Sequence, residues 1–279
     1  SSIRSNAFSG NTDLTSVTVE GDEGRFNDSW LSIGLPIELM PGIFVSNGLT
    51  FSKLTGTILG YDITEGRDVV IPSTIDGVEV NSIGDRAFQS LGIDSVVIPD
   101  TVTSIGDYAF NNNYLEAVTI PNSVRTMGQH AFSSNRLKTV LLSNRLTTIQ
   151  WYAFENNQIT EIDLHEGLTR IYYEAFDNNQ LSEVIFPRSI QTVYRGAFRN
   201  NRITSITFND GVTRIYDSVF SNNNLQTLTI PSQVSSIRSN AFSGNTDLTS
   251  VTIEGDEGRF NDSWLSIGLP IELLPDEED

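Results

Sequence analysis

The sequence predicts a repeat solenoid, a right-handed coil of short segments with a parallel β-sheet on one face. Three features predict it: a pattern that recurs every 22 residues, alternating apolar and polar positions within each unit, and an asparagine at a fixed place. One such unit buries too little apolar surface to offset about 1.5 kcal/mol of conformational entropy per ordered residue. Because stacked units cover each other's faces, the units are expected to fold only as an array.

The repeat is marked by the pair Ala-Phe. Its phenylalanine is found at Phe88, Phe110, Phe132, Phe154, Phe176, Phe198 and Phe242, and Val219-Phe220 fills the one gap in this series. Within a unit, Val118-Thr119-Ile120 alternates apolar and polar residues, as a short half-buried strand does. Proline then ends the strand in several units, because it has no N–H to donate to a neighbouring strand.

An asparagine follows each of these aromatic residues, except the first, at the third position. The column comprises Asn113, Asn135, Asn157, Asn179, Asn201, Asn223 and Asn245. An asparagine side chain both donates and accepts hydrogen bonds, so stacked copies can satisfy backbone groups that a coil buries. The column is therefore predicted to form a structural ladder along the solenoid.

These columns resemble a known family. The pattern L-x-x-V-x-I-P, the asparagine after AF-x-x, and the stretches SIGDRAF and SIGDYAF are similar to the BspA-type (Treponema pallidum-type) leucine-rich repeats of bacterial surface proteins. The resemblance covers Val80 to about Ile253 and the opening segment. It implies a leucine-rich-repeat fold, a cell-surface or secreted location, and adhesion to proteins or cells. The repeats have 22 residues where the family has 23, and only the last, with Leu248 one place late, has the extra residue.

The array is expected to have special end pieces. Residues 42–80 are predicted to form an N-terminal β cap with a hairpin turn at Asp76-Gly77, because Asp-Gly between apolar β-formers favours a tight turn. The leucine-rich repeats are placed at residues 81–253. Residues 254–279 are predicted to be a short C-terminal cap followed by an acidic tail.

The first 39 residues repeat residues 235–273 at every position but one, where Val19 stands against Ile253. Residues 1–41 are therefore interpreted as the terminal repeat and C-terminal cap of a preceding array copy. A natural tandem of near-identical modules and a cloning or engineering boundary both explain the duplication. In either case the segment's apolar side chains are expected to dock on the structure or on a second molecule, which would allow self-association.

Composition and motifs argue against several classes of function. A net charge of −18 disfavours nucleic acid, which is bound mainly through Lys and Arg, and no apolar run is long enough to span a bilayer. Neither of the two histidines lies in a nucleophile motif, and phosphate-binding glycine loops are missing. The chain is therefore predicted not to be an enzyme and to need no cofactor. The alternating residues Glu161, Asp163 and His165 share ligand chemistry, but nothing enforces a coordination geometry, so no metal site is predicted.

Two surfaces are candidate binding sites. On the predicted strand face, acidic and aliphatic side chains gather at Leu141, Glu161, Asp163, Glu183 and Ile185. This mixture suits a protein partner with basic and apolar groups, although an ordinary threonine-rich β surface is an alternative. On another edge, Tyr172, Tyr194 and Tyr216 follow one another on successive coils, with Trp151 alongside. They could bind sugars or a protein, or pack on each other.

The sequence therefore predicts a non-catalytic module that binds a macromolecule, in adhesion or protein–protein interaction. A carbohydrate-binding module that uses the tyrosine stripe, and a structural stalk, are the two alternatives.

Overall fold

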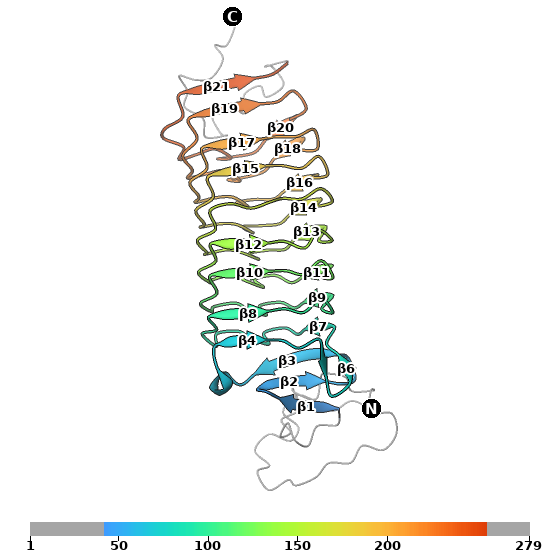
Figure 1. The fold of residues 1–279 in the computed structure, drawn as a ribbon. Helices are drawn as coiled ribbons and strands as arrows, with labels where there is room; N and C mark the ends of the chain where they lie inside the picture. The colour runs from blue at the N-terminus through green and yellow to red at the C-terminus, as the bar shows by residue number, and fades with distance from the viewer. Residues whose placement is uncertain (1–41, 256–279) are drawn as a thin grey trace, which may run out of the picture.

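The computed structural model describes residues 42–255, which stack as flat coils in a single column (Figure 1). Two series of short strands run along it. The first series, which we call the strand face, consists of β4 (Asp68–Val70), β8 (Ser95–Val97), β10 (Ala117–Thr119), β12 (Thr139–Leu141), β15 (Glu183–Ile185), β17 (Ser205–Thr207), β19 (Thr227–Ile230) and β21 (Ser250–Ile253). The predicted solenoid with parallel sheets is confirmed.

The second series consists of two-residue strands, which the sequence did not suggest as a separate sheet. They are β7 (Ser82–Ile83), β9 (Ser104–Ile105), β11 (Thr126–Met127), β13 (Thr148–Ile149), β14 (Arg170–Ile171), β16 (Thr192–Val193), β18 (Arg214–Ile215) and β20 (Ser236–Ile237). Each strand ends on a buried apolar residue, so a second wall closes the core opposite the strand face.

The N-terminal cap is antiparallel, as predicted. Strands β1 (Ile43–Ser46), β2 (Leu49–Ser52) and β3 (Thr57–Tyr61) form a meander, and β3 pairs in parallel with β7 of the first coil. A 3-10 helix (η4, Ile63–Glu65) follows β3. The hairpin of β5 (Thr74–Ile75) and β6 (Val78–Glu79) turns at Asp76-Gly77, where φ is +47° and +78°. The C-terminal cap and residues 1–41 lie outside the described residues, so their predictions stay predictions.

The register of the parallel strands follows the sequence repeat. Val118 lies opposite Val140, and Val184 opposite Ile206, one repeat of 22 residues further on in each case. Thr227 in β19 instead lies opposite Ser250 in β21, which absorbs the extra residue of the last repeat.

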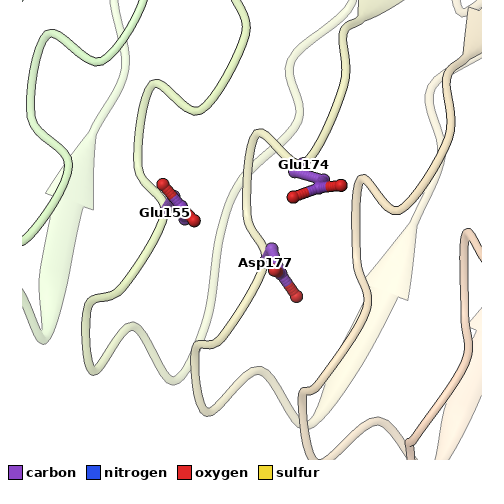
Figure 2. Close-up of side chains that lie close together, drawn as sticks. All are labelled: Glu155, Glu174 and Asp177. Atoms are coloured by element: carbon purple, nitrogen blue, oxygen red, sulfur yellow. The ribbon is translucent and has the colours of Figure 1, made fainter.

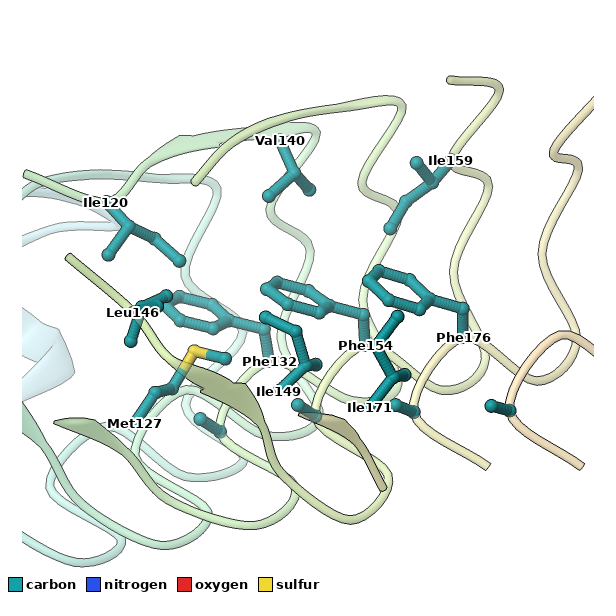
Figure 3. Close-up of a cluster of buried hydrophobic side chains, with 14 of the residues drawn as sticks. Ile120, Met127, Phe132, Val140, Leu146, Ile149, Phe154, Ile159, Ile171 and Phe176 are labelled. Atoms are coloured by element: carbon teal, nitrogen blue, oxygen red, sulfur yellow. The ribbon is translucent and has the colours of Figure 1, made fainter. Parts of the chain in front are cut away.

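The core is dominated by a column of stacked phenylalanine rings (Figure 3). Successive rings from Phe88 to Phe242 lie nearly parallel, with centroids between 4.9 and 5.8 Å apart. Aromatic pairs at such distances contribute about 0.5–1.5 kcal/mol beyond the burial of their surface. Because a ring recurs on every coil, the contact between neighbouring coils is the same along the column.

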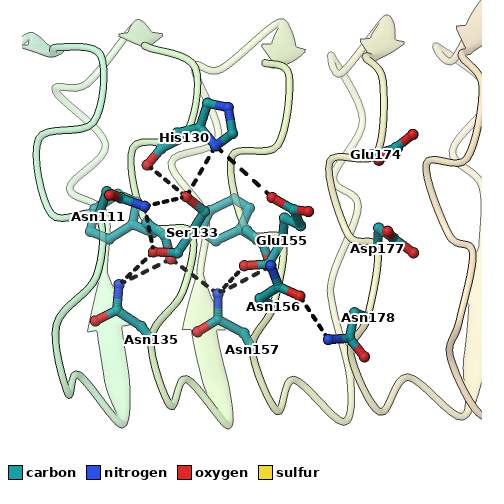
Figure 4. A network of polar contacts seen from close by, with 12 residues as sticks. Asn111, His130, Ser133, Asn135, Glu155, Asn156, Asn157, Glu174, Asp177 and Asn178 are labelled. Carbon is teal, nitrogen blue, oxygen red and sulfur yellow. Dashed lines mark hydrogen bonds and ion pairs between the residues drawn. The ribbon is translucent and has the colours of Figure 1, made fainter.

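The asparagine column lies directly beside these rings (Figure 4). Asn157 is typical: its Nδ2 donates to the carbonyls of Phe132 and Phe154 at 3.0 and 3.1 Å, and its Oδ1 accepts from the Leu137 N–H at 3.0 Å. Each asparagine thus joins two adjacent coils. Equivalent bonds are made by Asn113, Asn135, Asn179, Asn201, Asn223 and Asn245.

No helix within residues 42–255 is long and apolar enough to cross a membrane.

Candidate functional site: an acidic hollow in the strand face

The strand face lacks a strand at one coil, which is an interruption of the strand series. Residues 161–163 occupy the place of a strand between β12 and β15, yet they form none. The turns on either side remain joined to the column, since Gln158 donates its N–H to the Leu137 carbonyl and Thr169 donates to Thr147. Between them, the backbone of residues 161–164 makes no hydrogen bond with the rest of the described chain.

The side chains at this coil explain the interruption. The repeat would place Glu161 beside Glu183 of β15, and like charges directly opposite each other destabilise a strand pair. Asp163 takes the position that Thr119 and Thr207 occupy in other coils, and aspartate is disfavoured in strands. The strand expected from the repeat is therefore lost where three carboxylates meet.

The interruption leaves a hollow of about 510 Å³ in the strand face. Leu141 of β12 and Ile185 of β15 flank it, and they are 58% and 53% exposed. Glu161, Asp163 and Glu183 also line it, so all five residues predicted for this face lie around one depression. Phe186 and Pro187 extend the lining beyond the end of β15. We call this depression the acidic hollow.

Three carboxylates of the acidic hollow have no cationic partner within residues 42–255. Glu161, Asp163 and Glu183 are exposed, and none of their carboxylates has a hydrogen bond or an ion pair with another described residue. Glu166, also in the lining, accepts hydrogen bonds from the backbone N–H groups of Arg188 and Ser189. No Lys or Arg belongs to the lining.

His165 closes one side of the acidic hollow. Its Nδ1 lies 2.9 Å from the carbonyl of Glu166 and donates a hydrogen bond to it. The Nε2 atom is buried and has no partner among the described residues. Glu161, Asp163 and His165 do not gather their ligand atoms as a metal site requires.

In the described part of the chain, the metal-ligating atoms of Glu155, Glu174 and Asp177 do lie within 4.8 Å of one another (Figure 2). An arginine accompanies this group: Arg199 Nη2 lies 3.2 Å from Glu174 Oε2 and 2.7 Å from Asp177 Oδ2. Burial, followed by the charges of Asp177 and Glu174, raises the pKa of Glu155. With Arg199 as its cation, the cluster is explained as an internal ion-pair network.

The tyrosine stripe is also assembled, but its rings cover one another. Tyr172 and Tyr194 stack with centroids 5.0 Å apart and planes inclined by 4°, and Tyr216 follows at 5.5 Å. Trp151, which is 44% exposed, meets the ring of Tyr173 edge to face instead. A sugar ring stacks on an aromatic face, and here each stacked face already has a neighbour. The stripe as a binding site stays a prediction.

The parallel coils, stacked phenylalanines and asparagine ladder define a leucine-rich-repeat solenoid. The chain belongs to the BspA type leucine-rich repeat family, whose model matches residues 67–181 and 169–266. No curated protein matches the sequence.

Several solved structures are similar. A leucine-rich repeat protein from Bacteroides ovatus is 21% identical, over 76% of this chain and 62% of that one, with a TM-score of 0.54. This chain thus spans less than two thirds of that protein. The T. pallidum leucine-rich repeat protein is 22% identical over 71% of this chain and 75% of that chain, with a TM-score of 0.43. A leucine-rich cell surface protein from Faecalibacterium prausnitzii is 21% identical over 82% and 98%, with a TM-score of 0.32.

Proposed function

We propose that this chain is a non-catalytic binding module whose strand face docks a protein partner over the acidic hollow. The observation that carries the proposal is that two strongly exposed aliphatic side chains, Leu141 and Ile185, lie beside three carboxylates that have no cationic partner in the described part of the chain. Protein interfaces combine such apolar anchors with a polar rim of complementary charge. Adhesion or protein–protein interaction at a bacterial surface, or after secretion, is the role that this site supports best.

The other strand-face positions offer less to a partner. In β17, β19 and β21 the exposed positions carry serine and threonine, which lack both charge and a large apolar group: Ser205, Thr207, Thr227, Thr229, Ser250 and Thr252. Elsewhere in this series the exposed aliphatics Val70 and Val97 lie opposite each other on the paired strands β4 and β8, and no carboxylate stands between them in the register. The acidic hollow is thus the place where shape, apolar surface and charge coincide.

The test is binding of the immobilised full chain to a panel of matrix proteins and of bacterial and host polysaccharides at physiological salt. The variant Leu141→Thr/Ile185→Thr keeps good strand formers and removes the aliphatic walls. It is expected to weaken binding of a protein ligand by about ten-fold or more, as loss of a central apolar anchor does.

The matched control is Val70→Thr/Val97→Thr, which makes the same exchange at exposed positions of the same column. It is expected to leave the affinity within about two-fold. Saturable binding that both double variants leave unchanged would contradict the strand-face site. Binding lost on substitution of Tyr172, Tyr194 and Tyr216 would favour the carbohydrate alternative, and an empty panel would favour a structural stalk.

A further inference from the structure

Two groups of carboxylates lie on this solenoid, and they differ in whether they have ion-pair partners among the described residues. In the first group, Arg199 forms ion pairs with Glu174 and Asp177, and Glu155 lies beside these two carboxylates. The carboxylate of Glu116 also has a partner within the chain, because Lys138 Nζ on the next coil lies 2.9 Å from its Oε2. In the acidic hollow, Glu161, Asp163 and Glu183 receive no ion pair from the described residues. Any cationic side chain that pairs with them therefore comes from outside the described residues.

The walls of the hollow specify the kind of cation. Leu141 and Ile185 present aliphatic surface on both sides of the coil that carries Asp163. Lys and Arg side chains lay their methylene stems along apolar surface while their charged ends reach polar groups. A bare metal ion would gain nothing from these walls. The volume of about 510 Å³ lies within the usual range for a ligand pocket.

The floor of the hollow specifies the form of the ligand. The N–H and C=O groups of residues 161–164 make no backbone hydrogen bond within the described chain, unlike those of the paired strands on the same face. Unpaired backbone groups next to a sheet are sites where an extended polypeptide segment adds its own hydrogen bonds. A peptide chain satisfies these groups better than a free amine, because it brings donors and acceptors at regular spacing.

We propose that the acidic hollow receives a lysine or arginine side chain from an extended segment of the partner protein. The aliphatic stem lies between Leu141 and Ile185, and the charged end is held by Glu161, Asp163 and Glu183. The proposal rests on the proposed function, because it names the chemistry of the partner at the same site. It predicts that binding depends on charge and therefore weakens with added salt.

The experiment uses the full chain and fluorescent pentapeptides of sequence Thr-Val-Lys-Val-Thr with blocked ends. Further probes replace the central lysine by arginine, norleucine or glutamate. We expect saturable changes in fluorescence anisotropy with the lysine or the arginine peptide, and affinity for norleucine at least ten-fold lower. Comparison of lysine with arginine identifies the preferred cation. Equal affinity for norleucine and lysine, or no saturation by either basic peptide at millimolar concentration, would overturn the proposal.

A second pair of variants tests whether the basic peptides bind at the hollow or are attracted only by the net negative charge of the protein. Glu161→Gln/Asp163→Asn/Glu183→Gln neutralises the hollow and is expected to weaken binding of the basic peptides at least ten-fold. Glu79→Gln/Asp94→Asn/Asp247→Asn changes the net charge equally at exposed positions outside the hollow, and is expected to leave binding unchanged. Equal losses in both variants would overturn the proposal. The proposed function is judged separately by the protein panel: a partner whose affinity needs Leu141 and Ile185 but not these carboxylates supports docking and refutes the basic side chain.

Discussion

We call the asparagine column and the phenylalanine rings beside it the asparagine corner. The asparagine corner and the acidic hollow are built by the same coils, but they differ in regularity. At the corner, a phenylalanine and an asparagine recur at fixed places, and the buried amide of Asn157 has partners for both its donor and its acceptor atoms. At the hollow, the repeat is broken by Glu161 and Asp163, and backbone groups and carboxylates remain unpaired within the described chain. The comparison teaches that repeated columns maintain the fold, while departures from them mark the candidate site.

The largest effect that tests this comparison is expected from the corner. Phe154 is fully buried between Phe132 at 5.7 Å and Phe176 at 5.4 Å. Phe154→Ala is expected to lower the free energy of unfolding by about 4 kcal/mol, because it removes buried surface and leaves a cavity. Urea denaturation followed by circular dichroism measures the change. The control Tyr173→Ala removes a ring that is 38% exposed and is expected to cost less than about 1 kcal/mol. Equal losses would show that the ring column is not the main stabilising element.

The next largest effect concerns the amide ladder. Asn157→Ala is expected to cost about 2–3 kcal/mol, because the buried N–H of Leu137 loses its acceptor and several bonds to carbonyls disappear. The control is Asn156→Gly, an exposed neighbour with φ of +56° that glycine adopts without strain. It is expected to change stability by less than about 1 kcal/mol in the same urea titration. A loss from the control as large as that from Asn157→Ala would refute a special role for the buried column.

The sequence contained the information for the corner because its requirements are local and repeated. A fixed spacing of Phe and Asn predicts stacking and a ladder without knowledge of the coil's path. The strand-face register follows the same columns, and the extra residue of the last repeat, seen at Leu248, accounts for the register shift between β19 and β21.

Other features were not predictable in the same way. Tyr108, His130 and Tyr152 adopt positive φ values of 54° to 58°, although such residues disfavour this conformation by about 1–2 kcal/mol. Their N–H groups donate to the next coil, at the carbonyls of Gln129, Trp151 and Tyr173, and these bonds offset the strain. Such a compensation depends on contacts between coils, and at these three positions no glycine marks the conformation in the sequence.

The site was predictable only in part. Column positions placed Leu141, Asp163 and Ile185 side by side, but the same reasoning placed a strand at residues 161–163. Loss of that strand depends on the balance between backbone pairing and repulsion among carboxylates on adjacent coils. Neither Phe186 nor His165 was included in the predicted strand-face site, because each lies beyond the outward-facing column and enters the lining only through the local path of the chain.

A smaller effect is expected from repairing the hollow. Glu161→Thr/Asp163→Thr restores the residues typical of this face and removes the repulsion with Glu183. It is expected to raise the free energy of unfolding by about 1 kcal/mol and to restore strand pairing at this coil. Urea denaturation measures the stability, and the lysine peptide is expected to lose its binding to the same variant. The control Ser205→Thr, at an exposed position of the same column, is expected to change stability by less than about 0.5 kcal/mol. A repaired variant less stable than the wild type would show that the carboxylates are not what interrupts the sheet.

The smallest expected effect is on the pH dependence of the free energy of unfolding, which tests the contrast between the two carboxylate groups. Burial, with the charges of Asp177 and Glu174, raises the pKa of Glu155, so the folded state holds this proton more tightly than the unfolded state does. His130 Nδ1 lies 4.0 Å from Glu155 Oε2, but burial lowers the pKa of His130, so at neutral pH the imidazole brings no compensating charge.

The ionised carboxyl of Glu155 therefore costs stability at pH 7. Glu155→Gln is expected to raise the free energy of unfolding at this pH by less than about 1 kcal/mol. That gain should shrink as the pH falls through the raised pKa of the folded state, and it should be lost below the unfolded pKa of 4.5, where Glu155 is protonated in both states. Urea denaturation at a series of pH values measures the difference, with Glu79→Gln as the exposed control. A gain that grows on acidification would contradict the assigned cause.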